Sequence, residues 1–492
     1  MTASSLDIYE EKRSVNSEIL AIFKPGASQK TLWLTTLAFF LTFVVWFDMA
    51  PFTLTIAKNF QLNKTQVAAL LLCNLVLAVP GRVLAGRLLD RYGPRRLFGY
   101  LLIVMAIPNT FFAFSHTFVE LAISRLLVGL VGSGFVIGIR LVAEWYQGDH
   151  IGVAEGFYGG WGNFGSAAAA LSLPTIATLA ASGTNGWRWA IFTSGLISAI
   201  YGAIFLRIIK DAPNGEKFTR ARSASSLEVS TKLGLIGLLV IQIPMIVILG
   251  IVVNRLQSGH ILSTSESGLA YILLVGLLIY QSFTAISVNK VIIRGSRSEG
   301  SSYKFRSVFI LSLSYAVTFG TELTMVSLLP TYFANTFGLK IAAAGAAGSA
   351  FAFTNLITRP GGGIASDLSR SRTKMLSFLL IGAALTFLVL SKLTSQWPLA
   401  AGVALVALSS VFIQGSNGAT FAIVPTIRRD ITGQIAGIVG AYGNIGGLAL
   451  ASLLYYTSTK TSIGNVNLMF LVIAVAAVIV ALLSRFLLPD PE

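Results

Sequence analysis

Two arginines, Arg82 and Arg359, lie within long apolar segments, where an ionisable side chain is costly and usually has a function. Each stands eight residues before an aspartate, Asp90 or Asp367, so a helix would place it roughly 12 Å from that charged end. A guanidinium group is permanently charged, offers a planar fork of N–H donors and loses water more easily than an ammonium group. The pair therefore predicts a site for a small oxyanion, and nitrate, nitrite, bicarbonate and small carboxylates all fit it.

The two arginines are part of an internal repeat, a feature by which many transporters reveal their architecture. The pattern R-x3-G-x3-D occurs once in each half, at the same offset for all three residues. A second repeated stretch reads GGWGNFG from residue 159 and GAYGNIG from residue 440. A structural arginine paired with a buried carboxylate is the alternative, but duplication of the whole pattern favours a site formed by both halves.

The second repeat carries an asparagine in each half, Asn163 and Asn444, among small residues. Small side chains let helix backbones approach closely, and packing alone explains the repeated glycines Gly162, Gly165, Gly443 and Gly446. Packing does not explain an amide at the same place in both halves, because a buried amide needs hydrogen-bond partners. We expect both amides to donate to the bound oxyanion.

The composition requires membrane-spanning helices to carry these residues. Hydrophobic residues make up 54% of the chain, charged residues make up 11%, and the mean hydropathy is +0.76. Apolar runs of about 20 residues, each long enough to cross the hydrocarbon core, follow one another along the chain. We predict an all-α polytopic membrane protein with about fourteen helices, near residues 31–57, 66–89, 97–115, 119–140, 153–180, 188–208, 233–254, 268–289, 306–334, 341–364, 374–391, 397–419, 433–456 and 465–487.

The repeat divides these helices into two six-helix bundles, 31–208 and 306–488. Between them, residues 209–305 hold an inserted helix pair at 233–254 and 268–289, bracketed by polar linkers rich in Ser, Lys and Arg. An even number of inserted helices preserves the orientation of the second bundle. We expect the inserted pair to lie outside the translocation path, because it interrupts the repeat.

The net charge of +16 reports membrane topology. The Lys and Arg residues fall in short loops and form no continuous basic patch, so we expect no nucleic-acid partner. Most lie on the side of the tails, 1–30 and 489–492, and of the linkers, while the predicted outer loops hold few, Arg125 among them. The positive-inside rule then places both termini in the cytoplasm. We expect a multi-pass monomer in the lipid bilayer of the cell membrane.

These residues resemble the nitrate/nitrite porters of the major facilitator superfamily, whose signature is a G-x-[WY]-G-N-x-G stretch in the fifth and eleventh core helices. The resemblance covers nearly the whole chain except the inserted pair, and includes GIRLVAEWY, FGTELT and GATFAIVP. It implies the major facilitator fold and an anion clamped by Arg82 and Arg359. It also implies that Asn163 contacts the anion and that aromatic residues of core helices 4 and 7, Phe135 and Tyr315, sandwich it.

The segment GRLLDRYGPRR, residues 86–96, looks like the superfamily's loop motif between helices 2 and 3, and GIASDLSR is a shorter echo in the second half. The resemblance implies a gating role, in which Asp90 or Asp367 pairs with basic residues of the opposite bundle in one conformation and releases them in the other. Arg91 and Arg370 complete the candidate gating set. A solvated loop without a gating role is the alternative.

Asp48 and Glu322 are the deepest acidic residues of the predicted spans. An acid within the membrane can take up a proton when its charged form is desolvated, so both are candidates for proton coupling. The alternative, equally open at this point, is that each pairs with an arginine such as Arg82 or Arg359.

The remaining polar residues predict no further chemistry. Arg140 and Glu144, four residues apart on one predicted helix, are expected to form an ion pair. The three histidines are scattered in predicted loops and the lone Cys73 lies in an apolar run, so we expect no metal site and no disulfide. With no nucleophile beside a base, we also predict no catalytic residue, no cofactor and no enzymatic activity.

The sequence therefore favours a transporter that moves nitrate, nitrite or both by alternating access of two bundles. Proton symport and nitrate/nitrite exchange are both open, so nitrate, nitrite and protons are the expected partners. One alternative keeps the transporter and changes the substrate to another small organic or inorganic anion. Another, from a different class, is a nitrate-binding membrane sensor that signals through its linkers.

Overall fold

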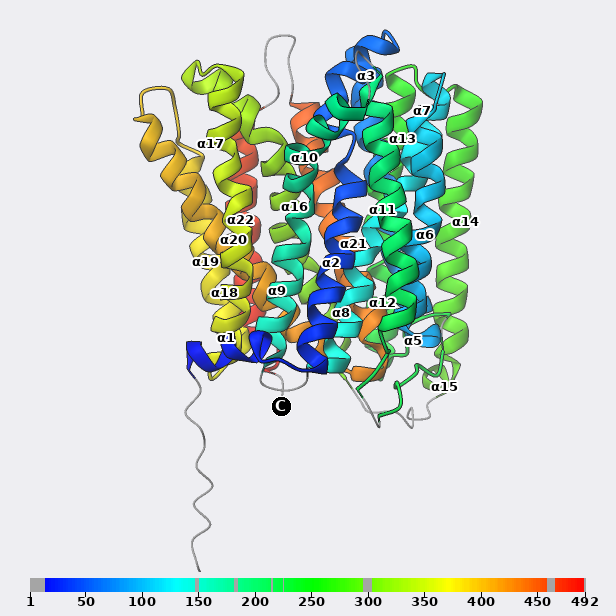
Figure 1. Cartoon of the computed structure of the whole chain (residues 1–492). Coiled ribbons are helices and arrows are strands. Elements are labelled where there is room, and N and C mark those ends of the chain that lie inside the picture. The colour runs from blue at the N-terminus through cyan, green and yellow to red at the C-terminus, as the bar shows by residue number, and fades with distance from the viewer. Residues whose placement is uncertain are drawn as a thin grey trace, which may run out of the picture.

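The computed structural model describes residues 14–146, 150–180, 185–213, 216–223, 225–294, 303–457 and 465–490. Within these ranges the chain forms helices and connecting segments, and no β-strand. Twelve of the described helices are long and apolar enough to cross a membrane. Figure 1 shows them running side by side, with α1 (Val15–Phe23) lying across one end. We call this the lower end of the molecule and the opposite one the upper end.

The first half contains helices at all six predicted spans, and helical structure begins before residue 31 with α1 and the start of α2. The helices are α2 (Ala27–Phe47) with η1 (Ala50–Phe52) and α3 (Thr53–Asn59), α4 (Lys64–Val76) with α5 (Ala78–Tyr92), α6 (Pro94–Ala113), α7 (Phe118–Val128) with η2 (Gly129–Ser133) and α8 (Gly134–Trp145), α9 (Ile151–Asn163) with α10 (Gly165–Ala180), and α11 (Gly186–Ile208).

The second half repeats this order. Its helices are α16 (Phe305–Phe337), α17 (Ile341–Phe353) with α18 (Asn355–Leu368), α19 (Arg372–Leu390), α20 (Leu399–Ile427) with η4 (Arg429–Ile431), α21 (Thr432–Tyr456) and α22 (Val466–Leu487). Two predicted spans, α9–α10 and α17–α18, are not among the twelve apolar helices. Each is interrupted by one non-helical residue, Phe164 or Thr354, and is rich in small residues instead of large apolar ones. The predicted number of fourteen is therefore approximate.

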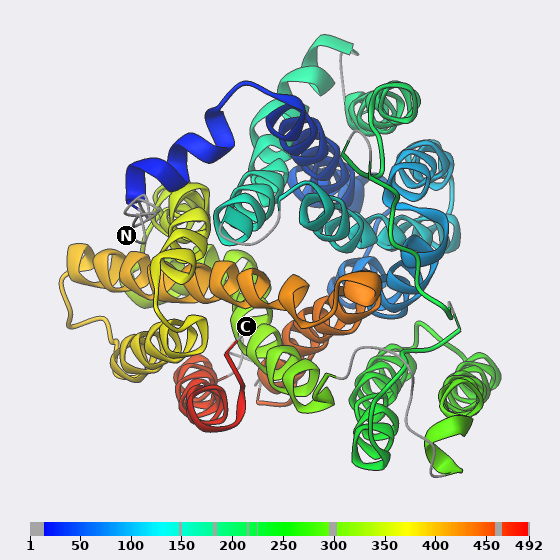
Figure 2. The same ribbon diagram turned by 90° about the horizontal axis from the view of Figure 1, so that it is seen from below.

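Between the halves, α12 (Lys232–Val240) with α13 (Ile243–Ser258) forms one span, and α14 (Thr264–Val288) followed by α15 (Lys290–Ile293) forms another. Seen from below in Figure 2, these green helices lie at one edge of the molecule. α12 packs against α16, and α13 packs against α21 and α4. The Tyr442 hydroxyl of α21 donates to the Ile241 carbonyl at 2.8 Å, so the inserted pair is fastened to the second half.

Two close helix crossings join the halves, α5 with α21 and α9 with α18. The repeated glycines make them possible. A Cβ atom on Gly86 would lie 2.3 Å from the Gly433 carbonyl oxygen, and one on Gly363 would lie 1.9 Å from the Gly152 carbonyl oxygen. Only glycine permits such backbone contact. The crossings bring the helices that carry Arg82 and Arg359 to equivalent places on the two sides of the molecule.

Candidate functional site

Arg82 is completely buried on α5 and reaches into the second half. Its Nε donates to the Gly132 carbonyl oxygen at 3.1 Å, and its Nη1 donates to the Gly440 carbonyl oxygen of α21 at 2.7 Å. Its guanidinium carbon lies 5.4 Å from the centroid of the Phe135 ring and 5.1 Å from that of Phe319. Nη2 is buried without a hydrogen-bond partner among the described residues. One donor of Arg82 is therefore left for a ligand.

Arg359 occupies the corresponding place on α18. Its Nη2 donates to the Tyr315 hydroxyl at 3.1 Å, and its guanidinium carbon lies 5.3 Å from the Phe135 ring centroid. Its Nη1 makes no hydrogen bond within the described ranges, although Glu322 Oε2 lies 3.7 Å away. A Cβ atom on Gly159 would lie 2.5 Å from Arg359 Nε, so that glycine makes room for the guanidinium. The two guanidinium groups thus flank a single aromatic ring.

An aromatic stack lies beside both arginines. Phe135 of α8 and Tyr315 of α16 are nearly parallel, with an interplanar angle of 5° and centroids 5.7 Å apart. Phe319, one turn after Tyr315, stacks on it with centroids 4.9 Å apart. Phe319 is absent from the predicted site, although a spacing of four residues on one helix places both rings on the same face. The structure therefore adds a third ring to the two predicted ones.

Glu322 of α16 is held by three asparagine amides from three helices. Asn163 of α9 and Asn355 of α18 donate to its Oε1 at 3.0 and 2.8 Å. Asn417 of α20 donates to its Oε2 at 2.8 Å. Together with the nearby Arg359, these donors surround the carboxylate. Asn163, which is predicted to contact the anion, donates one of its two amide hydrogens to Glu322 in this conformation.

Asn444, the repeat partner of Asn163, has a different environment. It is completely buried on α21, one turn after Gly440, the residue whose carbonyl oxygen accepts from Arg82. Both its amide nitrogen and its amide oxygen lack a hydrogen-bond partner in the described part of the chain. A buried amide without partners is costly, so this side chain is available for a ligand or water.

A pocket lies on the upper side of Glu322. It is lined by the polar residues Asn163, Glu322 and Asn355, by Phe319, and by side chains farther toward the upper end, such as Val326. Phe319 of the aromatic stack forms part of the lining, and Tyr315, one turn farther toward the lower end, is fully buried. The anion site is therefore approached from the upper side in this conformation.

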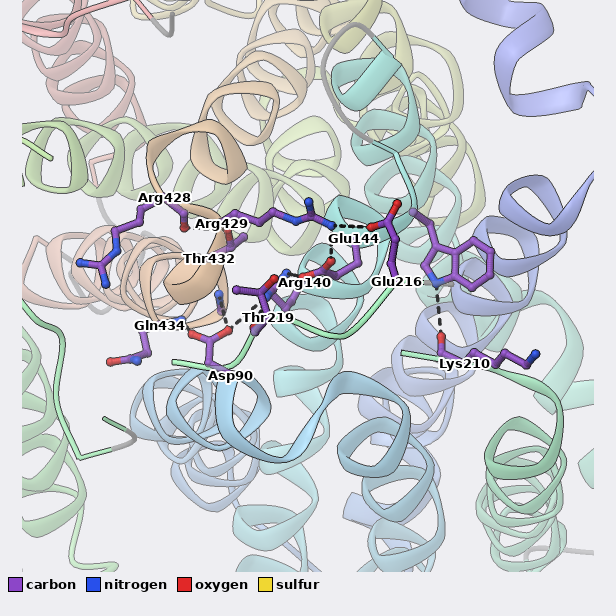
Figure 3. Close-up of polar contacts among 12 residues, drawn as sticks. Asp90, Arg140, Glu144, Lys210, Glu216, Thr219, Arg428, Arg429, Thr432 and Gln434 are labelled. Atoms are coloured by element: carbon purple, nitrogen blue, oxygen red, sulfur yellow. Dashed lines mark hydrogen bonds and ion pairs between the residues drawn. The ribbon is translucent and has the colours of Figure 1, made fainter. Parts of the chain in front are cut away.

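The lower end is closed by two equivalent helix caps. The Asp90 carboxylate accepts the backbone N–H groups of Gly433 and Gln434, at the start of α21, at 3.0 and 2.8 Å. The Asp367 carboxylate accepts those of Gly152 and Val153, at the start of α9, at 3.1 and 2.8 Å. Each aspartate thus binds the N-terminus of a helix in the opposite half, where a negative charge is favourable. Figure 3 shows the contact of Asp90.

These contacts differ from the predicted ones, because the opposite half contributes backbone N–H groups instead of basic side chains. Among the described residues, each aspartate has a basic partner in its own half. Asp90 pairs with Arg140 at 3.1 Å, and Asp367 pairs with Arg372 at 2.9 Å. The two predicted gating arginines lie on the exposed surface of the lower end: Arg91 and Arg370.

An ion pair between the halves was not predicted. Arg429 of the second half contacts Glu144 of α8 at 2.7 Å and Glu216 of the linker at 3.2 Å, as Figure 3 shows. Glu144 also pairs with Arg140, which confirms the predicted i, i+4 ion pair. The sequence gives no spacing signal for a pair between residues so far apart in the chain.

Residues 216–223, which we call the strap, lie across the closed lower end (Figure 3). Arg140 Nη2 donates to the Thr219 carbonyl oxygen at 2.9 Å, and the Ala221 N–H group donates to the Asp90 carbonyl oxygen at 3.1 Å. In the second half, Gln434 Nε2 donates to the Ser223 carbonyl oxygen at 3.0 Å. The strap therefore touches both halves at the place where they meet.

Asp48 is separate from the anion site. Its Oδ1 pairs with Arg125 Nη1 at 3.0 Å, and its Oδ2 accepts from the Ser194 hydroxyl at 3.0 Å. The placement of Arg125 in an outer loop is wrong, because the side chain is 2% exposed and lies on α7. Of the two roles left open for Asp48, the geometry favours an arginine pair, although with Arg125 and not with Arg82 or Arg359. Among the described residues, no group of three or more His, Cys, Asp and Glu could hold a metal ion.

Comparison with known proteins identifies the family to which this architecture belongs. The sequence profile described as the Major Facilitator Superfamily matches residues 34–298 and 309–492. A nitrate/nitrite transporter, NrtP, of Picosynechococcus is 40% identical, with 94% of this chain and 93% of that protein covered. The chain belongs to the nitrate/nitrite porter family of the major facilitator superfamily. Membership makes it a multi-pass membrane transporter and not an enzyme.

More distant relatives and solved structures agree. NrtP of Nostoc punctiforme is 39% identical over 96% of this chain and 94% of that protein, and the High affinity nitrate transporter 2.5 of Arabidopsis thaliana is 25% identical over 94% and 81%. The proton:xylose symporter XylE has a TM-score of 0.62 at 14% identity, covering 94% of this chain and 97% of that one. At that identity the match shows the major facilitator fold alone.

Proposed function

We propose that this porter moves nitrate and nitrite across the membrane, clamping each anion between Arg82 and Arg359. The observation that carries the proposal is that the two buried guanidinium groups flank the Phe135 ring and each keeps one buried N–H group without a hydrogen-bond partner in the described ranges. A planar oxyanion matches these donors in charge and geometry. The names of the relatives, nitrate/nitrite transporters among them, support the same substrates.

The aromatic stack must part to admit the anion between its rings. A planar ion in contact with two ring faces needs centroids about 7 Å apart, twice an ordinary contact distance, whereas those of Phe135 and Tyr315 are 5.7 Å apart. The two rings must therefore move apart before a planar anion can lie between them. Binding would separate the rings and release Asn163 from Glu322, so that Asn163 can donate to the anion beside Asn444, whose amide has no hydrogen-bond partner among the described residues.

Transport follows from alternating access. In this conformation the helix caps, the ion pair between Arg429 and Glu144 and the strap close the lower end, while the pocket above Glu322 approaches the site from the upper end. Rocking of the two halves would open the lower end and close the approach from the upper end. We place the lower end and both termini in the cytoplasm, because the linkers and short loops at the lower end hold most of the Lys and Arg residues outside the spans. We also propose that the chain is a monomer in the cell membrane.

Coupling is the finer part of the proposal. Glu322 lies 3.7 Å from Arg359, a jaw of the proposed clamp, and receives the amide hydrogen of Asn163. Protonation of its carboxylate would free both donors for the anion and remove a like charge from the site. Proton symport is the coupling that this geometry favours. Nitrate/nitrite exchange is the alternative, and it would run without a proton gradient.

Uptake of nitrate and nitrite into proteoliposomes tests the substrate and the clamp together. Arg82→Lys and Arg359→Lys keep the charge but lose the planar fork. Loss of one charge-assisted contact in a desolvated site costs roughly 2–5 kcal/mol, so anion affinity should fall about 30-fold or more. Arg188→Lys, at a half-buried arginine near the upper end, is the control and should transport normally. If folded Arg359→Lys keeps near-normal affinity, the clamp is wrong.

A further inference from the structure

Glu155 of α9 is a buried carboxyl group that the anion site does not use. It is 1% exposed, and neither of its carboxyl oxygens has a hydrogen-bond partner in the part of the chain that the structure describes. The sequence analysis did not select it, because its place in the second half is taken by Ala436 and the repeat therefore gives no signal. A membrane-embedded acid without a partner calls for a function.

The contacts of two glycines on the same face of α9 show where Glu155 lies between the two halves. A Cβ atom on Gly152, three residues earlier, would lie 2.6 Å from Asp367 Oδ1. One on Gly159, four residues later, would lie 2.5 Å from Arg359 Nε. Glu155 therefore lies between the helix cap that closes the lower end and the arginine that forms the anion site. It sits where α9 of the first half packs against α18 of the second.

Few of the helices that pack around Glu155 carry a charged residue near it. Its electrostatic interactions are with Arg359 and with Tyr158 of its own helix. α10 and α20, which also pack on α9, contribute no charged residue. The other titratable or charged groups on the packed elements and at the start of α9 lie at or near the lower end: Glu18 of α1, Lys30 of α2, Arg140 and Glu144 of α8, Asp367 of α18, and His150. None of them hydrogen bonds to Glu155 among the described residues.

An ionised carboxylate that is removed from water without a donor is far more costly than the neutral acid. With the lower end closed, Glu155 therefore carries a proton. When α9 and α18 separate at the lower end, water reaches the carboxyl group and hydrates its charged form. The balance between the two forms then depends on the pH of the lower compartment.

We propose that Glu155 is a proton-binding site that opens to the lower side of the membrane. On opening, its O–H bond breaks, the proton passes to water, and a hydrated carboxylate remains. Before the lower end closes, the carboxylate regains a proton from water, because closure around the charge is too costly. The inference rests on the proposed alternating access. It means that opening of the lower end is linked to a proton on Glu155, separate from any proton on Glu322.

Linkage fixes the sign of the effect. The closed form binds one more proton than the open form, so acid favours closure and alkali favours opening of the lower end. With one linked proton, the ratio of open to closed molecules should rise by up to about tenfold per pH unit. Glu155→Gln has no proton to exchange and should remove this dependence while favouring the closed form.

The test measures the opening of the lower end directly, without any anion. Spin labels on Tyr92→Cys and Arg370→Cys, in a Cys73→Ala background, report the distance between the halves at the lower end. Both positions are exposed there. In lipid discs between about pH 5 and about pH 9, a range that lies above the ordinary pKa of a hydrated glutamate, about 4.3, and in which a buried carboxyl group can titrate, the long-distance population should grow with pH. Glu155→Gln should abolish this growth, and Glu155→Asp, which keeps a carboxyl group, should retain it.

Glu120→Gln, at an exposed glutamate on α7, is the matched control and should behave as the parent does. If Glu155→Gln keeps the parent's pH dependence, then Asp367 or His150 carries the titration and the proposal is overturned. A parent with no pH dependence overturns it as well. Because no anion is present, neither result depends on whether nitrate is the substrate, which the uptake assay decides separately.

Discussion

At the scale of single residues, the central question is how one site accommodates both a carboxylate and an anion. In this conformation, Glu322 accepts from Asn163 and lies 3.7 Å from Arg359, two of the groups that the anion would use. Two negative charges in apolar surroundings repel strongly. Proton uptake by Glu322 and anion binding should therefore favour each other, and by linkage the effect must be reciprocal.

Glu322→Gln is predicted to make anion affinity independent of pH. Glutamine keeps the size of the side chain but not its charge, so the site should behave at every pH as the protonated wild type does in acid. Nitrate binding measured by calorimetry across the pH range checks this. Asn74→Ala, which removes a buried amide bonded to Trp46 and not to Glu322, controls for loss of an internal hydrogen bond. A pH dependence that survives in Glu322→Gln would mean that another group, and not Glu322, binds the linked proton.

Asp48→Asn is predicted to affect stability and not coupling. The substitution leaves the buried Arg125 guanidinium without a carboxylate, and breaking a buried pair in this way costs roughly 3–5 kcal/mol. The melting temperature in detergent should fall, while the proton dependence of uptake by the folded fraction stays that of wild type. Changed proton dependence with an unchanged melting temperature would restore Asp48 as a coupling residue.

The residues that could be predicted are those that the repeat duplicates or the family signature marks. Arg82, Arg359 and Asn163 belong to this class, and all three lie at the site. Asn355 and Asn417 could not be predicted, because each is a single polar residue whose partner, Glu322, lies on another helix. Their role exists only once three helices have packed.

At the scale of elements, the two helix caps are the feature that makes the lower end symmetric. Asp90 ends α5 and caps α21, while Asp367 ends α18 and caps α9, so each half closes on the other by the same bond. Backbone N–H groups at a helix start have no partner within their own helix. Closure therefore satisfies groups that opening must expose to water.

Asp90→Asn and Asp367→Asn are each predicted to loosen the lower end. An asparagine keeps one acceptor oxygen but loses the charge that interacts with the helix dipole, and the loss of a cap costs about 0.5–2 kcal/mol. The open population should rise about 2-fold to 30-fold. The spin-label pair at positions 92 and 370 measures this, and the exposed Glu120→Gln is the control. Unchanged distances in both variants would mean that the strap and the ion pair between Arg429 and Glu144 hold the lower end closed without the caps.

Helix positions follow well from hydropathy, whereas breaks within helices do not. The sequence predicts α9 and α10 as one span, yet Phe164 interrupts them directly after the GGWGN run. Small residues there allow the tight contact of Gly165 with the Phe40 carbonyl, for which a Cβ atom would come within 2.1 Å. Such breaks depend on the neighbouring helix and so leave no local signal.

At the scale of the whole molecule, the inserted helix pair is added to two six-helix halves that repeat the same order of helices. The prediction that it lies outside the translocation path is untested, but its contacts are with the outer faces of α16, α21 and α4. The structure also shows how to remove it. The Tyr303 N–H group donates to Ser230 Oγ at 3.1 Å, so the chain enters and leaves the pair at nearly the same point.

A chain that lacks residues 231–302, with Ser230 joined to Tyr303, is predicted to fold and to transport nitrate with wild-type affinity. The strap and both bundles are retained. The contacts with α16, α21 and α4 are lost, together with the hydrogen bonds between Asn289 and the linker residues Leu227 and Val229. Uptake into proteoliposomes checks the prediction, with a full-length chain carrying Tyr442→Phe as the control for the lost hydrogen bond to Ile241. Folded protein without uptake would make the pair part of the pathway.

The strap has a consequence for how this chain can vary over time. Its contacts with Arg140, Asp90 and Gln434 are made by carbonyl and N–H groups of Thr219, Ala221 and Ser223, and every amino acid except proline supplies both. Point substitutions at Thr219, Ala221 and Ser223 should therefore drift freely, unlike those at Glu216 and Phe218, whose side chains contact Arg429 and Arg140. Insertions and deletions should not, because a change of length moves all three groups out of register at once. Among close relatives, these three positions should differ in amino-acid type, while the length of the strap should stay the same.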